Sequence, residues 1–228
     1  SKEKIYSIDR NLWGISIECG ALEDPWAEPP KDAWQISKDI DDTPHKPRYI
    51  EICFERGEPW YLDGKEMQPR ELIRRLNDIG GGYGVGRSDL VESRLVGIKT
   101  REIYETPAAT ILSCAHQALE NLVLDRELLH FKQRISLKYA QLVYYGLWHT
   151  PLKAALDKFI AETQKKVTGS VRLKLHKGSC AVVGRRSPHS LYKKELATYS
   201  ADDKFEQGLA EGFIRLWGMP YLPPLVYR

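Results

Sequence analysis

The stretch VESRLVGIKTREIYETP, residues 91–107, places an acid and a phenol close to an aliphatic run. We expect Glu92 to be partly buried, and a buried carboxylate requires a cation or several hydrogen-bond donors. The ammonium group of a zwitterionic amino acid would satisfy this requirement. Tyr104 adds a hydroxyl that can donate or accept a hydrogen bond. The expected burial of Glu92 rests on its aliphatic neighbours Leu90, Val91, Leu95 and Val96.

Two serines lie in a similar setting near the start of the chain. Ser7 and Ser16 stand at the two ends of SIDRNLWGIS, beside an apolar strand pattern. Serines are common, so neither residue alone indicates a binding site. Glu92, Arg94 and Tyr104 would equally suit a solvated strand face, on which scattered charges are ordinary. Residue types by themselves therefore leave two interpretations open, a site for a small amino acid or polar surface.

Spacing adds a geometric requirement to the first interpretation. Glu92 and Tyr104 are twelve residues apart, which corresponds to about 40 Å in a straight strand. Both side chains can contact one small ligand only if the chain reverses between them. Gly97 or the segment 99–102 would provide that reversal. The same reasoning requires a turn between the two serines, at residues 9–11.

Composition narrows the class of protein. The chain has 228 residues, of which 42% are hydrophobic and 29% charged, as in soluble globular proteins with one core or one core and an appendage. The net charge of +3 does not suggest a nucleic-acid binder, which normally carries a strongly basic surface. No apolar run approaches the ~20 residues of a membrane span, and the N-terminal residues do not resemble a signal peptide. The first residue is not Met, which fits a fragment of a longer chain.

Common metal, redox and phosphate motifs are missing or incomplete. Cys19, Cys53, Cys114 and Cys180 form no C-x-x-C pair, so we expect buried, reduced thiols and a reducing, cytoplasmic location. The six histidines show no zinc-binding spacing, and no metal site is predicted. The segment GGGYGVGR, residues 80–87, lacks the Gly-Lys-Ser/Thr of a phosphate-binding loop. We interpret it as a turn at which the backbone approaches a neighbouring segment closely.

Local patterns predict strands, a hairpin and a helix, then one strand, three helices, a second hairpin and a last helix. Antiparallel strands segregated from helices indicate an α+β fold. The segment ALEDPWAEPPKDAWQISKDIDDTPHKP holds five prolines and is expected to be a long surface excursion. The expected strands are 12–19, 48–55, 60–62 and the hairpin 171–183, and the expected helices are 69–79, 108–124, 126–145, 151–166 and 204–217.

Some residues are expected to cap helices through their side chains, and others to form hairpin turns through their backbone preferences. An apolar tail, YLPPLVYR, is expected to pack on a neighbour, since an exposed apolar tail promotes aggregation. The expected helix caps are Asp125, Thr150 and the Asp203–Glu206 pair, and the expected hairpin turns are Asp63-Gly64 and Lys177-Gly178.

Four long stretches of the chain resemble argininosuccinate synthase. They are YSIDRNLWGISIECGALEDPW, GVGRSDLVESRLVGIKTREIYETPAATIL, LDRELLHFKQRISLKYAQLVYYGLW and GRRSPHSLYKKELATY. They cover almost the whole chain in the family's order, and motifs of this length do not arise by chance. The resemblance implies an ATP-dependent ligase, in which the ureido oxygen of citrulline attacks the α-phosphate of ATP and releases pyrophosphate. The amine of aspartate then displaces AMP to give argininosuccinate.

The resemblance also implies roles for the residues considered above. Ser7 and Ser16 match the family's citrulline-contacting serines. Glu92 and Tyr104 match its citrulline-contacting acid and phenol, and Glu92 would bind the α-ammonium by a charge-assisted hydrogen bond. None of the four is an obvious general base, so the catalytic residue is unknown. Catalysis would rest chiefly on positioning and on phosphate electrostatics.

One motif of the family is missing from this chain. The family's nucleotide domain carries an S-G-G-L-D-T-S phosphate loop, and no such motif occurs here. We therefore expect a C-terminal portion, with a synthetase domain over 1–200 and an oligomerisation helix and tail over 201–228. ATP, its Mg²⁺ and the aspartate contacts would belong to the absent domain, so no cofactor site is expected here. The isolated chain is expected to be inactive, and the full enzyme to be a homotetramer with exchanged C-terminal arms.

Two other functions fit parts of the sequence. A non-enzymatic oligomerisation or scaffold domain would bind protein partners through the proline-rich excursion and the apolar tail. An RNA-binding protein would use the hairpin on which Arg172, Lys174 and His176 alternate with aliphatic residues. The near-neutral net charge argues against RNA, and an ordinary solvated sheet face has the same alternation.

Overall fold

The computed structural model describes residues 6–198 and 204–221, which belong to two compact units. The first unit ends at Leu191 and holds both sheets, and the second begins at Tyr192. Antiparallel sheets and separate helices make the first unit α+β, as predicted. The functional division at residues 200 and 201 stays a prediction, because compactness assigns no role to either unit.

A five-stranded antiparallel sheet forms the larger part of the first unit. In spatial order its strands are β5 (Lys65–Glu66), β4 (Glu58–Leu62), β3 (Arg48–Glu55), β8 (Gly169–His176) and β9 (Ser179–Arg186). The turns at Asp63-Gly64 and Lys177-Gly178 have the positive φ angles that two-residue hairpins require, which confirms both predictions. Alternate residues are buried, as predicted, and these are Ile50, Ile52 and Phe54 on β3 and Val171, Leu173 and Leu175 on β8.

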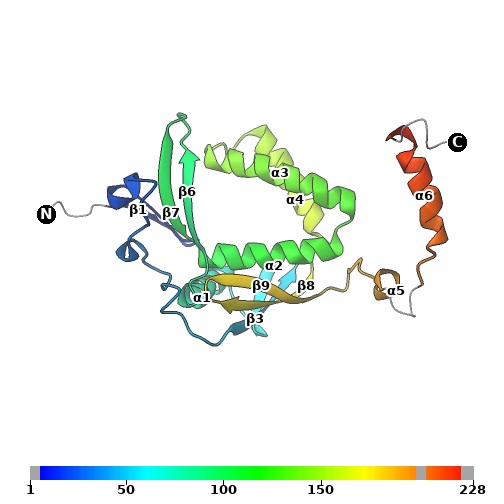
Figure 1. Cartoon of the computed structure of the whole chain (residues 1–228), viewed down its shortest axis with the longest axis horizontal. Coiled ribbons are helices and arrows are strands. Elements are labelled where there is room, and N and C mark those ends of the chain that lie inside the picture. Colours follow the sequence, from blue (N-terminus) through cyan, green and yellow to red (C-terminus); the bar gives the residue numbers. More distant parts are fainter. Residues whose placement is uncertain (1–5, 199–203, 222–228) are drawn as a thin grey trace. The chain divides into compact units, whose positions relative to one another are not determined.

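Helices cover one face of this sheet (Figure 1). Helices α1 (Pro69–Gly82) and α2 (Pro107–Val123) bury their apolar stripes against the inward strand residues in one core. Beyond α2, a pair is formed by α3 (Arg126–Tyr144) and α4 (Pro151–Gln164). Two of the three predicted caps are confirmed, because the Asp125 carboxylate accepts a hydrogen bond from the Leu128 amide at 3.1 Å and the Thr150 hydroxyl accepts one from the Lys153 amide at 3.3 Å.

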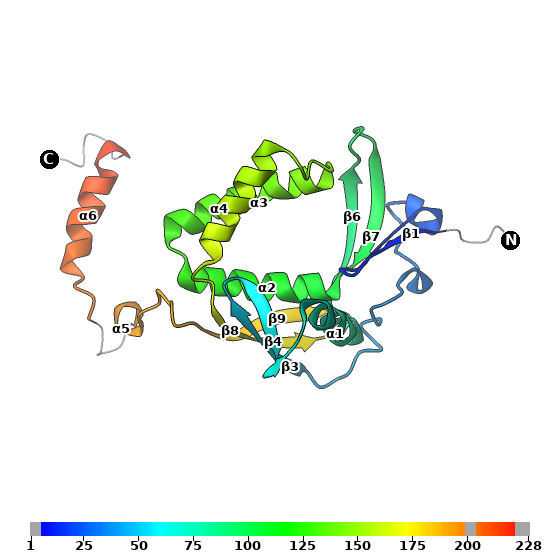
Figure 2. The same cartoon turned by 180° about the vertical axis from the view of Figure 1, so that it is seen from behind.

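A smaller, four-stranded antiparallel sheet stands where the chain enters α2 (Figure 2). In spatial order its strands are β1 (Ser7–Arg10), β2 (Ile15–Glu18), β7 (Lys99–Glu105) and β6 (Arg87–Ser93). One face of the sheet packs on the long excursion, which runs over the surface as predicted and contains the 3₁₀ turns η1 (Gly20–Glu23) and η2 (Lys31–Ala33). This second core is small and consists of Ile15, Ile17, Ile103, Leu22 and Ala33.

The second unit contains α5 (Lys194–Ala197), α6 (Gly208–Gly218) and η3 (Met219–Tyr221). Helix α6 begins four residues later than predicted, since the expected helix spans 204–217. The predicted cap residue Asp203 and the tail from residue 222 lie outside the described residues. The large apolar side chains of α6 are exposed, and they are Leu209, Phe213, Ile214, Leu216 and Trp217.

Helix α1 extends further than its sequence suggests. It continues to Gly82 instead of ending at residue 79. A Cβ atom on Gly81 would lie 2.4 Å from the carbonyl oxygen of Ile36, and one on Gly80 would lie 2.8 Å from the Ile111 side chain. The glycines therefore serve close packing inside the helix, and the predicted close approach of the backbone is confirmed.

The four cysteines differ from the expectation in one respect. All four are free thiols, as predicted, but each is half-buried and not fully buried. Desolvation and the neighbouring Cys114 raise the pKa of the Cys180 thiol to about 12, so that thiol is unreactive.

Close packing at Gly81 predicts a position-specific loss of stability. Gly81→Ala should destabilise the chain by about 1–3 kcal/mol, because the new methyl group must displace the backbone at Ile36. Gly82→Ala is the matched control, since nothing lies within 4 Å of a Cβ there, and its effect should be neutral or stabilising by up to about 1 kcal/mol. Urea unfolding of both variants measures the difference. Equal effects at the two positions would contradict the packing argument.

Candidate functional site

The smaller sheet has one face that carries all four predicted site residues. Residues opposite each other in an antiparallel pair point to the same side, and so do residues two apart along a strand. Ser16 is opposite Tyr104, and two residues along these strands Glu18 is opposite Glu102. Ser7 is opposite Glu18, and Glu92 is opposite Thr100. The register therefore gathers Ser7, Ser16, Glu92 and Tyr104, together with Glu18 and Glu102, on a single face, which we call the acid face.

Glu92 and Tyr104 are in direct contact because the chain reverses between them. The phenol oxygen of Tyr104 lies 3.1 Å from Glu92 Oε2. The reversal is the turn from Arg94 to Ile98, in which Gly97 adopts a φ of 86°. The prediction of Gly97 is confirmed, and the alternative segment 99–102 is wrong, because it lies within β7. The single strand expected in this stretch is a two-stranded hairpin.

The two serines lie at different distances from this contact. The amide of Asn11 donates to the carbonyl of Gly14 at 3.0 Å, so the turn overlaps the predicted residues 9–11 only at Asn11, and residues 9 and 10 belong to β1. Ser16 lies next to Tyr104 on the neighbouring strand. Ser7 is on the edge strand β1, two strands or about 10 Å from Glu102. The structure thus brings Ser16, Glu92 and Tyr104 together and leaves Ser7 at the margin of the same face.

The acid face carries more negative than positive charge. Glu18, Glu92 and Glu102 contribute three carboxylates, while Arg94 contributes one guanidinium, whose Nη2 donates to Glu18 Oε2 at 2.8 Å. With Asp9, which is opposite Ser16 on the same face, four negative charges and one positive charge leave −3 when all the groups are ionised. Burial raises the pKa of the Glu102 carboxyl, and Glu92 and Glu18 raise it further, against the hydrogen bond from Tyr104 and the charge of Arg94. The face therefore favours the approach of a cation.

Tyr104 serves this face as a neutral hydrogen-bonding group. Burial raises the pKa of its phenol far above the ordinary value, and the hydrogen bonds to Glu102 and Glu92 raise it further. A phenol held in its protonated form donates and accepts hydrogen bonds but does not serve as a general base near neutral pH. The described residues of this face therefore suit binding and orientation of a ligand.

The aliphatic residues around Glu92 do not bury it in the expected way. Leu90, Val91, Leu95 and Val96 are all exposed, with Val96 at 76%, because they lie on the projecting end of the β6–β7 hairpin. Glu92 is half-buried, and the groups next to it are those of β7, not its own sequence neighbours. The expectation of an apolar surround was wrong, because it assumed a strand packed on the core.

Sequence reasoning missed Glu18 and Glu102 as members of the site. The signal for Glu102 is its position two residues before Tyr104, which places both side chains on one face once a strand is assumed. Glu18 has no comparable local signal, because only the pairing of β2 with β7 brings it opposite Glu102.

A buried acid on the opposite face holds the excursion against the sheet. Glu105 is 0% exposed and accepts hydrogen bonds from the amides of Gln35 and Ser37, both at 2.7 Å, and from the amide of Ile36. The Ser37 hydroxyl also donates to Glu105, and Arg87 Nε donates to that hydroxyl oxygen at 2.7 Å. This carboxylate is fully satisfied within the fold, unlike the carboxylates of the acid face.

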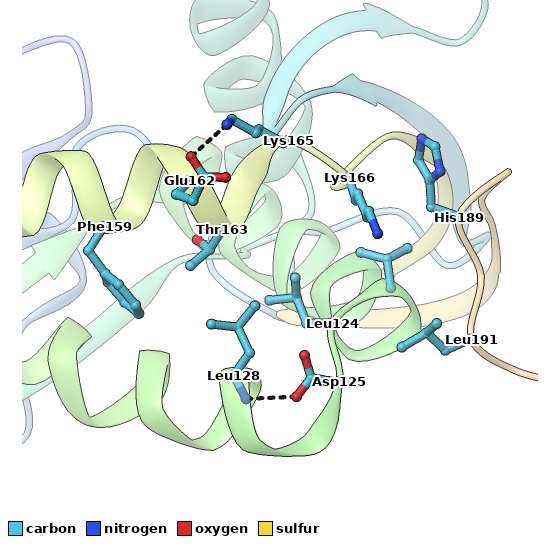
Figure 3. A pocket seen from close by; sticks show the side chains of 11 residues that line it. Leu124, Asp125, Leu128, Phe159, Glu162, Thr163, Lys165, Lys166, His189 and Leu191 are labelled. Carbon is cyan, nitrogen blue, oxygen red and sulfur yellow. Dashed lines mark hydrogen bonds and ion pairs between the residues drawn. The ribbon is translucent and has the colours of Figure 1, made fainter.

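A hollow of about 540 Å³ lies between the α2–α3 junction, α4 and the segment after β9 (Figure 3). Its floor is apolar, and Glu162 and Lys165 beside it pair with each other at 2.6 Å. None of the predicted site residues lines it.

Among the described residues no group of three or more side chains could hold a metal ion. None of the helices in 6–198 and 204–221 is both long and apolar enough to cross a bilayer.

The fold and the acid face define an α+β domain with a negatively charged face on its smaller sheet. Residues 6–222 match the family model described as "Arginosuccinate synthase C-terminal domain". The chain belongs to the argininosuccinate synthase family, as its motifs suggested.

Relatives from several bacteria agree with this membership. Argininosuccinate synthases of Aquifex aeolicus, Acaryochloris marina and Rubrobacter xylanophilus are 56%, 55% and 54% identical to it over 222, 219 and 220 residues. These alignments cover 96% of this chain in each case, but only 55%, 55% and 54% of the three relatives. The chain therefore spans about half the length of the curated relatives it matches.

The surplus negative charge of the acid face predicts that replacing Glu102 by a neutral residue raises the folding stability, by an amount that depends on pH. Because the pKa of Glu102 is raised by folding, ionising Glu102 disfavours the folded state, and stability falls as the pH rises above about 4.5. Glu102→Gln should therefore stabilise the chain at pH 7, by less than about 1 kcal/mol because the group is partly solvated. The gain should disappear below about pH 4. Thermal unfolding from pH 4 to 8 measures it, with exposed Glu66→Gln as the control. A loss of stability at pH 7 would contradict the charge surplus.

Proposed function

We propose that the acid face is part of the citrulline site of an argininosuccinate synthase, with Glu92 binding the α-ammonium of citrulline. The observation that carries this proposal is the 3.1 Å contact between Glu92 and Tyr104, on the same face as Ser16 and Ser7. Membership of the family supports it, because the same four residues match the family's citrulline contacts.

The charge balance fits this ligand. Citrulline is a zwitterion, and its ammonium would lie beside Glu92 while relieving the surplus negative charge of the face. The hydroxyls of Ser7, Ser16 and Tyr104 can donate to the carboxylate or ureido oxygens of the ligand. Since no general base is evident among them, their contribution to the reaction is to hold the ureido group in position for attack.

The remaining steps would belong to the complete enzyme. We propose that it joins citrulline to aspartate with ATP, releasing AMP and pyrophosphate, and that it is a cytoplasmic enzyme of arginine biosynthesis. ATP, Mg²⁺ and aspartate would bind to the half of the protein that this chain does not span. In support, the chain spans only 54–55% of the relatives' length, and the sequence contains no S-G-G-L-D-T-S motif.

We also propose that the complete enzyme is a homotetramer with contributions from the second unit. Helix α6 exposes Phe213, Ile214 and Trp217, each by more than 60%. A helix with so much exposed apolar surface generally buries it against another chain. A purely structural role as an oligomerisation or scaffold domain is the alternative, and it leaves the charge of the acid face without a purpose.

Binding of citrulline tests the proposed site. NMR titration of the ¹⁵N-labelled chain with citrulline at millimolar concentrations should shift amide signals of β2, β6 and β7. Glu92→Gln should weaken binding at least about tenfold, because it removes the charge that pairs with the ammonium. Glu66→Gln is the control variant on another sheet, and N-acetylcitrulline is the control ligand, since it lacks the ammonium. Equal shifts with N-acetylcitrulline would contradict the role of Glu92.

An activity assay tests the proposal that this chain alone lacks the nucleotide-binding part of the enzyme. With ATP, citrulline and aspartate, the 228-residue chain should release no pyrophosphate above background, because it lacks a phosphate-binding loop. An argininosuccinate synthase such as the Aquifex aeolicus relative serves as the positive control under the same conditions. Pyrophosphate release by the chain alone would show that the nucleotide also binds here.

A further inference from the structure

Tyr104 lies between two carboxylates but has only one proton to donate. Its phenol oxygen is 2.8 Å from Glu102 Oε2 and 3.1 Å from Glu92 Oε2. A neutral phenol has a single O–H donor, so only one of these carboxylates receives its proton at a time. The shorter contact is the one to Glu102, which favours Glu102 as the acceptor.

The direction of this hydroxyl decides what Glu92 can do. If the proton pointed to Glu92, the phenol would use one acceptor position of that carboxylate and would present its hydrogen, not a lone pair, to a ligand ammonium. When the proton points to Glu102, Glu92 Oε2 remains an open acceptor. The lone pairs of the phenol oxygen are then also available to an ammonium placed between Tyr104 and Glu92.

We propose that Glu102 is a positioning residue, which accepts the Tyr104 proton so that Glu92 and the phenol oxygen can together accept hydrogen bonds from an ammonium group. The ligand class is therefore an α-amino acid with a free, protonated amine. This inference rests on the proposed function, because it assigns a role in the same site. Glu102 is well placed for it, since residues two apart on β7 share a face and a fixed separation.

The surroundings of Glu102 explain why its charge matters to a ligand. Four groups act on it: Glu18 on β2, Glu92 on β6, Arg94 in the turn, and Tyr104 on its own strand. Two of these are like charges, and the single cation, Arg94, is already bonded to Glu18. An ionised Glu102 thus adds to a negative potential that a bound ammonium relieves. Protonation of Glu102 would remove this charge and leave only a weaker, neutral acceptor for the phenol proton.

The proton arrangement can be tested without a ligand. In the chain labelled with ¹³C at glutamate carboxyls, Tyr104→Phe should raise the pKa of Glu102, because the donor that stabilises its ionised form is lost. Tyr61→Phe, an exposed tyrosine of the larger sheet, is the matched control and should leave this pKa unchanged. An unchanged Glu102 pKa in Tyr104→Phe would overturn the inference.

Ligand affinity gives the second test, by NMR titration with citrulline from pH 4 to 8. Glu102→Leu should weaken binding at pH 7 about tenfold, and Glu102→Gln, which keeps an acceptor but loses the charge, about threefold. In the Tyr104→Phe background, Glu102→Leu should cause a much smaller loss, since there is no proton left to direct. A structural role alone would not produce this coupling. The unmodified chain should also lose affinity as the pH falls through the Glu102 pKa, and this loss should be smaller in Glu102→Gln.

The variants separate this inference from the proposed function. If Glu92→Gln abolishes binding while Glu102→Leu binds like the unmodified chain, Glu102 is not a positioning residue and the proposed site stands. If Glu92→Gln binds citrulline normally, the proposed function fails, whatever Glu102 does. If Glu102→Leu loses its folded NMR spectrum, Glu102→Gln decides: a smaller loss of affinity at low pH than in the unmodified chain supports the inference, and an equal loss overturns it.

Discussion

The pairing register of β2 with β7 is the constraint on which the acid face depends. Side chains alternate along a strand, so a slip of one residue would turn Tyr104 and Glu102 toward the core and bring Ile103 to the surface. The buried pair of Ile17 and Ile103 opposes such a slip, because exposing two isoleucines would cost several kcal/mol in lost burial. Burial on one face of the sheet thus determines the chemistry of the other.

Glu105 strengthens the same constraint with hydrogen bonds. It projects from the core face at the end of β7 and binds three consecutive amides of the excursion. A one-residue slip would leave these amides and a buried carboxylate without partners, which is far more costly than losing a surface contact. The network through Ser37 and Arg87 also ties the first residue of β6 to the excursion. Both strands of the projecting hairpin are therefore anchored at their base.

The smaller sheet contains two kinds of carboxylate, which differ in how far the protein itself satisfies their hydrogen bonds and charge. Glu105 has all its hydrogen-bonding needs met inside the protein, as expected of a structural acid. Glu92, Glu102 and Glu18 share one phenol, one guanidinium and the Thr100 hydroxyl among three charges. The fold gains no stability from such an arrangement, and under the proposed function an amino-acid ligand would supply the positive charge that it lacks.

Several elements could be predicted from the sequence because their causes are local. Asp125 and Thr150 cap helices through amides three residues away, and Lys177-Gly178 closes a hairpin through its own backbone preference. The motifs shared with argininosuccinate synthases also identified Glu92, Tyr104 and the two serines before any geometry was known. The extension of α1 through its glycines was not predictable, because Ile36 and Ile111, which pack on them, are distant in sequence.

The sequence by itself determined the local elements, the family and the residue types available for binding. The tertiary structure decided which of those residues meet. It placed Glu18 and Glu102 beside Tyr104, left Ser7 on an edge strand, and exposed the aliphatic end of the hairpin that was expected to surround Glu92. The physical reason is that caps, turns and side-chain alternation depend on neighbours along the chain, whereas strand register depends on burial and hydrogen bonds between distant segments.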